Sequence, residues 1–67
     1  MRFCEQLDAL MDEKCETNYA LAKAIGASQS TVANWRNGKT IPAIRYVGKL
    51  AEHFGVPVSQ MRKMRSS

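Results

Sequence analysis

Apolar residues recur at intervals of three and four positions in successive segments of this 67-residue chain. At about 100° per residue, such spacing places them on one side of a helix, whereas a half-buried strand alternates every second residue. Gly26, Gly38 and Gly55 stand where three of the segments stop, and glycine is the residue that most often ends a helix. The pattern predicts an all-α fold of five helices without a sheet. We expect one domain over residues 1–63 and a basic C-terminal tail over residues 64–67.

The first segment predicts a helix over residues 3–15 with one apolar and one acidic side. Its apolar arc holds Phe3, Leu7, Leu10, Met11 and the two cysteines, Cys4 and Cys15. Its acidic arc holds Glu5, Asp8, Asp12 and Glu16. This arc is expected to be a solvated face of the helix. Because carboxylates repel phosphate, it should also point away from a polyanion. On one helix the two cysteines would lie roughly 16 Å apart, too far for a disulfide, and we expect them in or beside the core.

Two short helices, over residues 18–25 and 28–37, are predicted to flank a tight turn at Gly26. Thr17 and Ser28 each offer a side-chain oxygen to the free backbone N–H groups at the start of a helix. The buried sides are formed by Leu21, Ala22 and Ile25 in the first helix and by Val32 and Trp35 in the second. Helices this short are marginal alone, so each depends on the other. The arrangement is that of a helix-turn-helix that reads DNA.

The outward side of the helix over residues 28–37 carries polar side chains suited to reading bases. Gln and Asn can each form two hydrogen bonds with adenine, and Ser can bond several base edges. The N-terminal residues of a recognition helix are the ones that reach bases. The predicted base contacts are Gln29, Ser30, Thr31 and Asn34. The alternative is that these residues, Ser30 and Thr31 above all, only supply the polar side chains common at a helix start.

Contacts with the DNA backbone are predicted on both sides of this helix. Asn18 opens the preceding helix, whose N-terminus directs free N–H groups outward and suits a phosphate, unless Asn18 merely helps to start the helix. Lys39 and Thr40 follow the helix end, in a loop that can also offer backbone N–H groups to phosphate. The predicted backbone contacts are Asn18, Arg36, Asn37, Lys39, Thr40 and Arg45.

A fourth helix is predicted from Pro42 to about Phe54, because the fixed φ of proline suits a helix start. Its buried side would hold Ile44, Val47, Leu50, Ala51 and Phe54. Gly48 inside this helix costs about 1 kcal/mol relative to Ala. A close approach of another helix would explain its presence.

A fifth, short helix is predicted over residues 58–63, followed by a frayed basic tail. Val58, Met61 and Met64 are expected to leave an apolar surface near the end of the domain. Two copies could pair there as a homodimer with a two-fold axis. Such a dimer would place its recognition helices about 34 Å apart, which matches one turn of DNA.

The net charge of +4 is unevenly distributed. Residues 1–16 carry five acidic against two basic side chains, whereas residues 17–67 carry eight basic side chains against Glu52 alone. An acidic end and a basic remainder favour a polyanion as partner. The charge pattern therefore supports binding of double-stranded DNA.

Other classes of function find little support in the sequence. No apolar run approaches the about 20 residues of a membrane span, and no signal peptide is visible, so a cytoplasmic protein is expected. His53 is the one histidine, and neither metal-ligand spacing nor a nucleophile beside a base occurs. We expect no enzyme activity, metal, cofactor, membrane contact or small-molecule ligand.

Residues 18–37 resemble the helix-turn-helix of the lambda-repressor-like family, which includes Cro, phage repressors and Xre-type regulators. The likeness rests on the small Ala22 where the two helices cross, on Gly26 in the turn and on the apolar positions given above. The stretch SQSTV at residues 28–32 is similar to the start of the family's recognition helix, and NGK at residues 37–39 is similar to its end. Residues 42–61 also follow the family pattern, whereas residues 1–16 match only as a generic first helix.

The resemblance implies a compact five-helix DNA-binding domain whose second and third helices form the helix-turn-helix. It places base contacts on Gln29, Ser30 and Asn34. It places Asn18 at a position where the family commonly has Gln, which contacts the DNA backbone and braces the recognition helix. Asn is shorter than Gln, and this is the main departure from the family pattern at the expected interface.

The expected function is a sequence-specific double-stranded DNA-binding transcription regulator of bacterial or phage type. The simplest mode is a repressor that occupies its operator as a homodimer on a palindrome, since the chain has no room for an effector domain. The alternative is an antitoxin-like or other protein-interaction module with the same fold. A flexible binding segment beyond the fold would favour that alternative, and the basic stretch over residues 62–67, which includes the tail, is short for one.

Overall fold

Five α-helices and no strand make up the part of the chain that the computed structural model describes, residues 3–66. The helices are α1 (Phe3–Glu13), α2 (Asn18–Ile25), α3 (Gln29–Arg36), α4 (Ile44–Phe54) and α5 (Val58–Ser66). The all-α fold predicted from the sequence is thereby confirmed. Among these described residues, no helix has the length and apolar character needed to cross a membrane.

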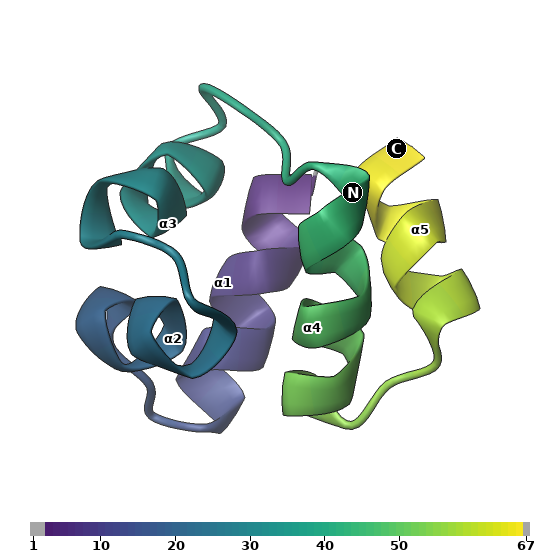
Figure 1. Cartoon of the computed structure of the whole chain (residues 1–67), viewed down its shortest axis with the longest axis horizontal. Helices are drawn as coiled ribbons and strands as arrows, with labels where there is room; N and C mark the ends of the chain where they lie inside the picture. Colours follow the sequence, from purple (N-terminus) through teal and green to yellow (C-terminus); the bar gives the residue numbers. More distant parts are fainter. Residues whose placement is uncertain (1–2, 67) are drawn as a thin grey trace.

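The helices form two pairs joined by α1 (Figure 1). α2 and α3 pack together on one side, α4 and α5 pack together on the other, and α1 contacts both α3 and α5. α2 also contacts α4, which closes the arrangement into a domain of 25 × 23 × 23 Å. The loop between α3 and α4 lies on the same side of the molecule as the end of α5.

Capping residues determine where both helices of the helix-turn-helix begin and where α2 ends. The Thr17 hydroxyl accepts from the backbone N–H of Ala20 at 3.1 Å, and the Ser28 hydroxyl accepts from that of Thr31 at 3.1 Å. Gly26 ends α2 with a φ of 75°, a left-handed conformation that residues with a Cβ rarely adopt, and its N–H donates to the Ala22 carbonyl. These caps confirm the predicted bounds of α2 and leave α3 one residue shorter at each end.

All five helices contribute to one apolar core. α1 provides Phe3, Leu7 and Met11, α2 provides Leu21, Ala22 and Ile25, α3 provides Val32 and Trp35, α4 provides Val47, Leu50, Ala51 and Phe54, and α5 provides Met61 and Met64. Trp35 is only 2% exposed and meets the half-buried Tyr46 edge to face, with ring centroids 5.4 Å apart. α3 is therefore fixed to the domain through its apolar side.

The region after α1 differs from the prediction. α1 ends at Glu13, and Cys15 lies beyond it with a φ of 52°, so its side chain leaves the apolar arc and is exposed. The backbone N–H of Glu16 donates to the Met11 carbonyl at 2.9 Å, which turns the chain toward α2. Both cysteines are free, Cys4 is half-buried, and the expectation that Cys15 sits in or beside the core is wrong.

The acidic arc of α1 is not a uniformly solvated face. Asp8 forms an ion pair with Arg36 of α3, and Glu16 lies 2.7 Å from Nε2 of His53 on α4. Glu5 and Asp12 are exposed as predicted. The prediction fails at Asp8 and Glu16 because each carboxylate meets a group brought close by the packing of a distant helix.

α4 begins at Ile44 and not at Pro42. Pro42 is buried in the preceding loop, and Ala43 occupies the N-cap position without a side-chain hydrogen bond. Ile44 is 60% exposed, so its predicted place in the core is wrong. A Cβ added at Gly48 would meet nothing within 4 Å, which rules out the close helix approach proposed to explain this glycine.

α5 is longer than predicted, and its methionines point inward. The helix continues to Ser66, and Met61 and Met64 are 0% and 4% exposed because α5 packs them against α1 and α4. Nε of Arg65 donates to the Pro42 carbonyl at 2.7 Å, which fixes the end of α5 to the loop before α4. Residues 64–66 are thus part of the fold and not a frayed tail, while Ser67 lies outside the described residues.

Candidate nucleic-acid interface

α3 has one side in the core and one in solvent. Val32 and Trp35 anchor α3, whereas Gln29 and Ser30, at its N-terminal end, are exposed. Among residues 3–66, the side chains of Gln29 and Ser30 form no hydrogen bond. A rigid helix with free polar side chains at its N-terminus is the geometry needed to read base edges in a major groove.

The two other predicted base contacts are half-buried. The Thr31 hydroxyl lies 2.9 Å from the Ser28 hydroxyl, so it takes part in the cap of α3. The Asn34 carbonyl accepts the backbone N–H groups of Lys39 at 3.0 Å and Thr40 at 3.4 Å. The Asn34 amide side chain has no partner in the described part of the chain. Asn34 therefore resembles Gln29 in having a free amide, whereas Thr31 is already engaged.

The loop after α3 presents side chains and not the backbone N–H groups of its central residues. Asn37, Lys39 and Thr40 are all exposed, and Gly38 turns the chain with a φ of 76°. The N–H groups of Lys39 and Thr40 are already used by Asn34, so they are not available to a phosphate. Lys39 forms no ion pair within residues 3–66 and can approach a phosphate with its ammonium group.

Arg36 and Asn18, both predicted to contact the DNA backbone, contact each other. Nη1 of Arg36 donates to Oδ1 of Asn18 at 2.7 Å, and Nε of Arg36 donates to Oδ1 of Asp8 at 2.5 Å. This hydrogen bond connects the start of α2 to the C-terminal end of α3. The Arg36 guanidinium is engaged by two partners before any DNA is present.

Arg45 is the remaining predicted backbone contact. It is exposed on the first turn of α4, and its guanidinium carbon lies 5.1 Å from the centroid of the Tyr46 ring. Such a cation–π contact is worth about 0.5–1 kcal/mol at an exposed site. It orients the side chain without neutralising its charge.

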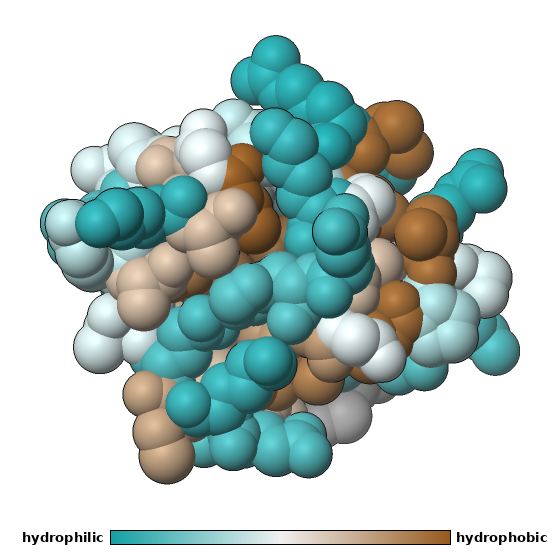
Figure 2. Space-filling view, turned by 60° about the horizontal axis from the view of Figure 1, so that its bottom comes forward, coloured by the Kyte–Doolittle hydropathy of each residue, from teal (hydrophilic) through white to brown (hydrophobic). Residues whose placement is uncertain are grey.

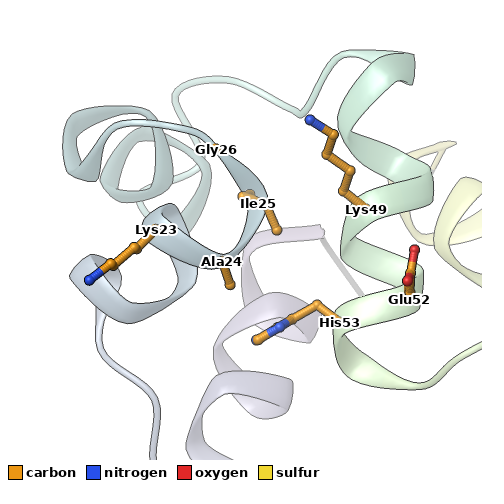
Figure 3. A pocket seen from close by; sticks show the side chains of 7 residues that line it. All are labelled: Lys23, Ala24, Ile25, Gly26, Lys49, Glu52 and His53. Carbon is orange, nitrogen blue, oxygen red and sulfur yellow. The ribbon is translucent and has the colours of Figure 1, made fainter.

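A hollow of about 730 Å³ lies between α2 and α4 (Figure 3). Lys49 extends toward the turn at Gly26, where an added Cβ would lie 3.9 Å from its Nζ, while Lys23 points away. His53 also lines the hollow, and its imidazole is already paired with Glu16. Among the described residues, no group of His, Cys, Asp or Glu could hold a metal ion.

A family model described as Helix-turn-helix matches residues 17–61, which include α2, α3, α4 and the first half of α5. The chain belongs to the lambda-repressor-like helix-turn-helix family. Neither curated proteins nor solved structures gave a match. Members of this family are DNA-binding regulators. The matched range includes the exposed end of α3 and the loop that follows it.

Three long-range contacts of charged side chains had no signal in the sequence. They are Asp8 with Arg36, Glu16 with His53, and the Arg65 side chain with the Pro42 carbonyl. The partners are 28, 37 and 23 residues apart, so helical spacing carries no signal for them. For the two ion pairs, the opposite charges of the residues were the only available indication.

Proposed function

We propose that this protein is a sequence-specific double-stranded DNA-binding transcription regulator that reads the major groove with α3. Gln29, Ser30 and Asn34 contact base edges. Thr31, whose hydroxyl also takes part in the cap of α3, is a fourth base contact. The observation that carries the proposal is the free, exposed pair Gln29 and Ser30 at the N-terminus of a helix anchored by Val32 and Trp35.

The residues around α3 contact the phosphate backbone in this proposal. Lys39 and Arg45 supply charge, and Asn18, Asn37 and Thr40 supply neutral donors. Phosphate contacts fix the orientation of the protein on the duplex and carry no sequence information themselves. Arg36 already has two partners, Asp8 and Asn18.

The regulator acts as a repressor, since a protein bound at an operator blocks access to that DNA. We place it in the cytoplasm of a bacterium, where its operator would lie on host or phage DNA. Two copies bind a palindromic operator, one on each half-site. The domain measures 25 × 23 × 23 Å, so two copies in contact can space their recognition helices by about 34 Å, one turn of DNA.

The surface for pairing lies between α4 and α5 and is not formed by the methionines. Ile44 and Val58 are 60% and 49% exposed and line a groove of about 350 Å³ together with Val47, Gly48 and Arg62. Figure 2 shows hydrophobic side chains at the surface on the α4 and α5 side, surrounded by hydrophilic ones. The open space beside Gly48 leaves room for an apolar side chain of a second copy.

Replacing Val58 by Lys is expected to prevent pairing. In a two-fold dimer the change buries a cation beside Arg62 and its symmetry mate, at a cost of at least about 2 kcal/mol. The dimer dissociation constant should then rise roughly 30-fold or more. Sedimentation equilibrium over a range of concentrations measures this. Tyr19→Lys, which changes another exposed hydrophobic residue, should leave the dimer dissociation constant unchanged. If the wild type is monomeric both in free solution and on DNA, the dimer is refuted.

Selection from random duplex DNA tests the proposed function. A regulator of this kind should enrich one motif, and the motif should be a palindrome with half-sites one turn apart. Recovery without any shared motif would mean that the basic surface binds nucleic acid without reading it. No recovery at all would favour the protein-interaction alternative.

Lys39→Ala is expected to weaken all duplexes about equally. Lys39 lies beyond the end of α3 and is exposed, so it can neutralise a phosphate but does not reach the base edges read by Gln29. With Lys39 and Arg45 on two protomers, four phosphates give a slope of log affinity against log salt of about −4. The variant should make the slope shallower by about one for each protomer bound. An unchanged slope would show that Lys39 faces away from DNA.

A further inference from the structure

Arg36 connects three helices at the point where α2 begins. Its Nε donates to Asp8 on α1, and its Nη1 donates to the amide oxygen of Asn18, the first residue of α2. All three side chains are half-buried. Because a guanidinium presents its donors as a rigid planar fork, the bond to Asp8 sets the orientation in which Arg36 meets Asn18.

The bond to Arg36 also determines which end of the Asn18 amide faces inward. A guanidinium has five donors and no acceptor, so the atom of Asn18 that faces Arg36 is the oxygen. The amide NH₂ group therefore points away from the guanidinium. Within residues 3–66 this NH₂ group has no acceptor.

The free NH₂ group belongs to the first turn of α2, where other donors are also unused. Thr17 accepts the backbone N–H groups of Ala20, through its hydroxyl, and Leu21, through its carbonyl. The N–H groups of Asn18 and Tyr19 have no acceptor in the described part of the chain. Donors at the positive end of a helix dipole suit the oxygen of an anion.

We propose that the Asp8–Arg36 ion pair positions Asn18 for DNA. It holds the amide so that the NH₂ group donates to a phosphate at the start of α2, and Arg36 itself does not contact DNA. This inference rests on the proposed DNA-binding function. It replaces the direct phosphate contact that the sequence suggested for Arg36 with a positioning role.

The charges explain why Arg36 stays with its partners when DNA binds. The Asp8 carboxylate already neutralises the guanidinium charge and takes its Nε–H, so a phosphate gains less from approaching Arg36 than from approaching an unpaired cation. Asn18 is a neutral donor and neutralises no phosphate. Loss of its contact should therefore lower affinity without changing the salt dependence, whereas loss of an arginine–phosphate contact changes both.

The test measures affinity for the selected operator and for a scrambled duplex at several salt concentrations. Asn18→Ala removes the phosphate donor. The double variant Asp8→Asn/Arg36→Met removes the ion pair as a unit, so the net charge of the protein stays the same. Each should weaken both duplexes roughly tenfold per bound protomer with an unchanged salt slope. The triple variant, which combines Asn18→Ala with Asp8→Asn/Arg36→Met, should bind no more weakly than either of them alone, because both changes act through one contact.

Arg45→Met is the matched control, since it removes an exposed arginine for which a direct phosphate contact is proposed. Its salt slope should become shallower by about one per protomer, and its loss of affinity should add to that of Asn18→Ala. If Asp8→Asn/Arg36→Met behaves like this control, Arg36 contacts DNA and the inference is wrong. A wild type without affinity for duplex DNA would instead overturn the proposed function together with the inference.

A measurement on the wild type covers the case in which the double variant fails to fold. During titration with operator DNA, the side-chain NH₂ resonances of Asn18 should shift. The Nε–H resonance of Arg36 should stay close to its position in the free protein, because Asp8 accepts that proton in both states. A large shift of Arg36 with Asn18 unchanged would overturn the inference.

Discussion

Replacing Trp35 by Ala is expected to destabilise the domain by about 3–5 kcal/mol. Trp35 is 2% exposed, packs edge to face on Tyr46, and is one of the two residues that anchor α3 in the core. A chain of this length has a total stability of roughly 3–10 kcal/mol, so the variant should be largely unfolded or melt at least about 12 °C lower. Thermal unfolding followed by far-ultraviolet circular dichroism measures the effect.

Tyr19→Ala is the control for this experiment. Tyr19 is also an aromatic residue on a short helix of the same motif, but it is 56% exposed. Its replacement should change the free energy of unfolding by no more than about 0.5 kcal/mol. Equal melting temperatures for Trp35→Ala and the wild type would show that α3 is not held through this side chain.

Replacing Gln29 by Ala is expected to cost about 1–3 kcal/mol of binding free energy at each preferred half-site. Gln29 opens α3, is exposed, and can offer a donor and an acceptor to one base edge. The loss should fall on the preferred sequence and should relax the choice at one base pair of each half-site. Titrations of the selected operator and of operators changed at single positions measure both effects.

Gln60→Ala is the matched control, because Gln60 is an exposed glutamine on α5. It should leave affinity and base preference as they are in the wild type. If Gln29→Ala weakens the operator and a scrambled duplex to the same degree, Gln29 contributes to general affinity and α3 is not the reader.

The helix-turn-helix could be predicted closely because its bounds depend on local chemistry. Thr17 and Ser28 cap the residues that follow them, and Gly26 takes a left-handed conformation next to the helix it ends. These effects act within a few residues along the chain. Neighbours in sequence were therefore sufficient to place α2 and α3.

The end of the chain and the start of α4 were less predictable because tertiary packing decides them. Helical spacing placed Met61 and Met64 on one apolar side of the fifth helix, but only their packing against α1 and α4 shows that this side is buried. Ile44 has the spacing of a core residue and is exposed, since it lies in the first turn of α4 at the rim of the groove with α5. The spacing of apolar residues predicts which side of a helix faces the core. The neighbouring helices determine which residues on that side are buried.

The DNA interface stays a prediction, and the structure adds contacts between its residues that the sequence did not indicate. Gln29, Ser30, Lys39 and Arg45 are exposed, as side chains that meet DNA need to be. Arg36 has a different environment, since its partners come from two other helices. No periodicity in the sequence relates residues that are 28 positions apart, so this contact required the structure.

The ratio of affinities for two duplexes tests most directly whether this protein reads DNA through α3. The wild type is titrated at one salt concentration with its selected operator and with a scrambled duplex of the same length and composition. We expect the operator to bind at least about 1,000-fold more tightly, and the ratio to fall in Gln29→Ala while Lys39→Ala leaves it nearly constant. A ratio near one for the wild type would contradict sequence-specific recognition.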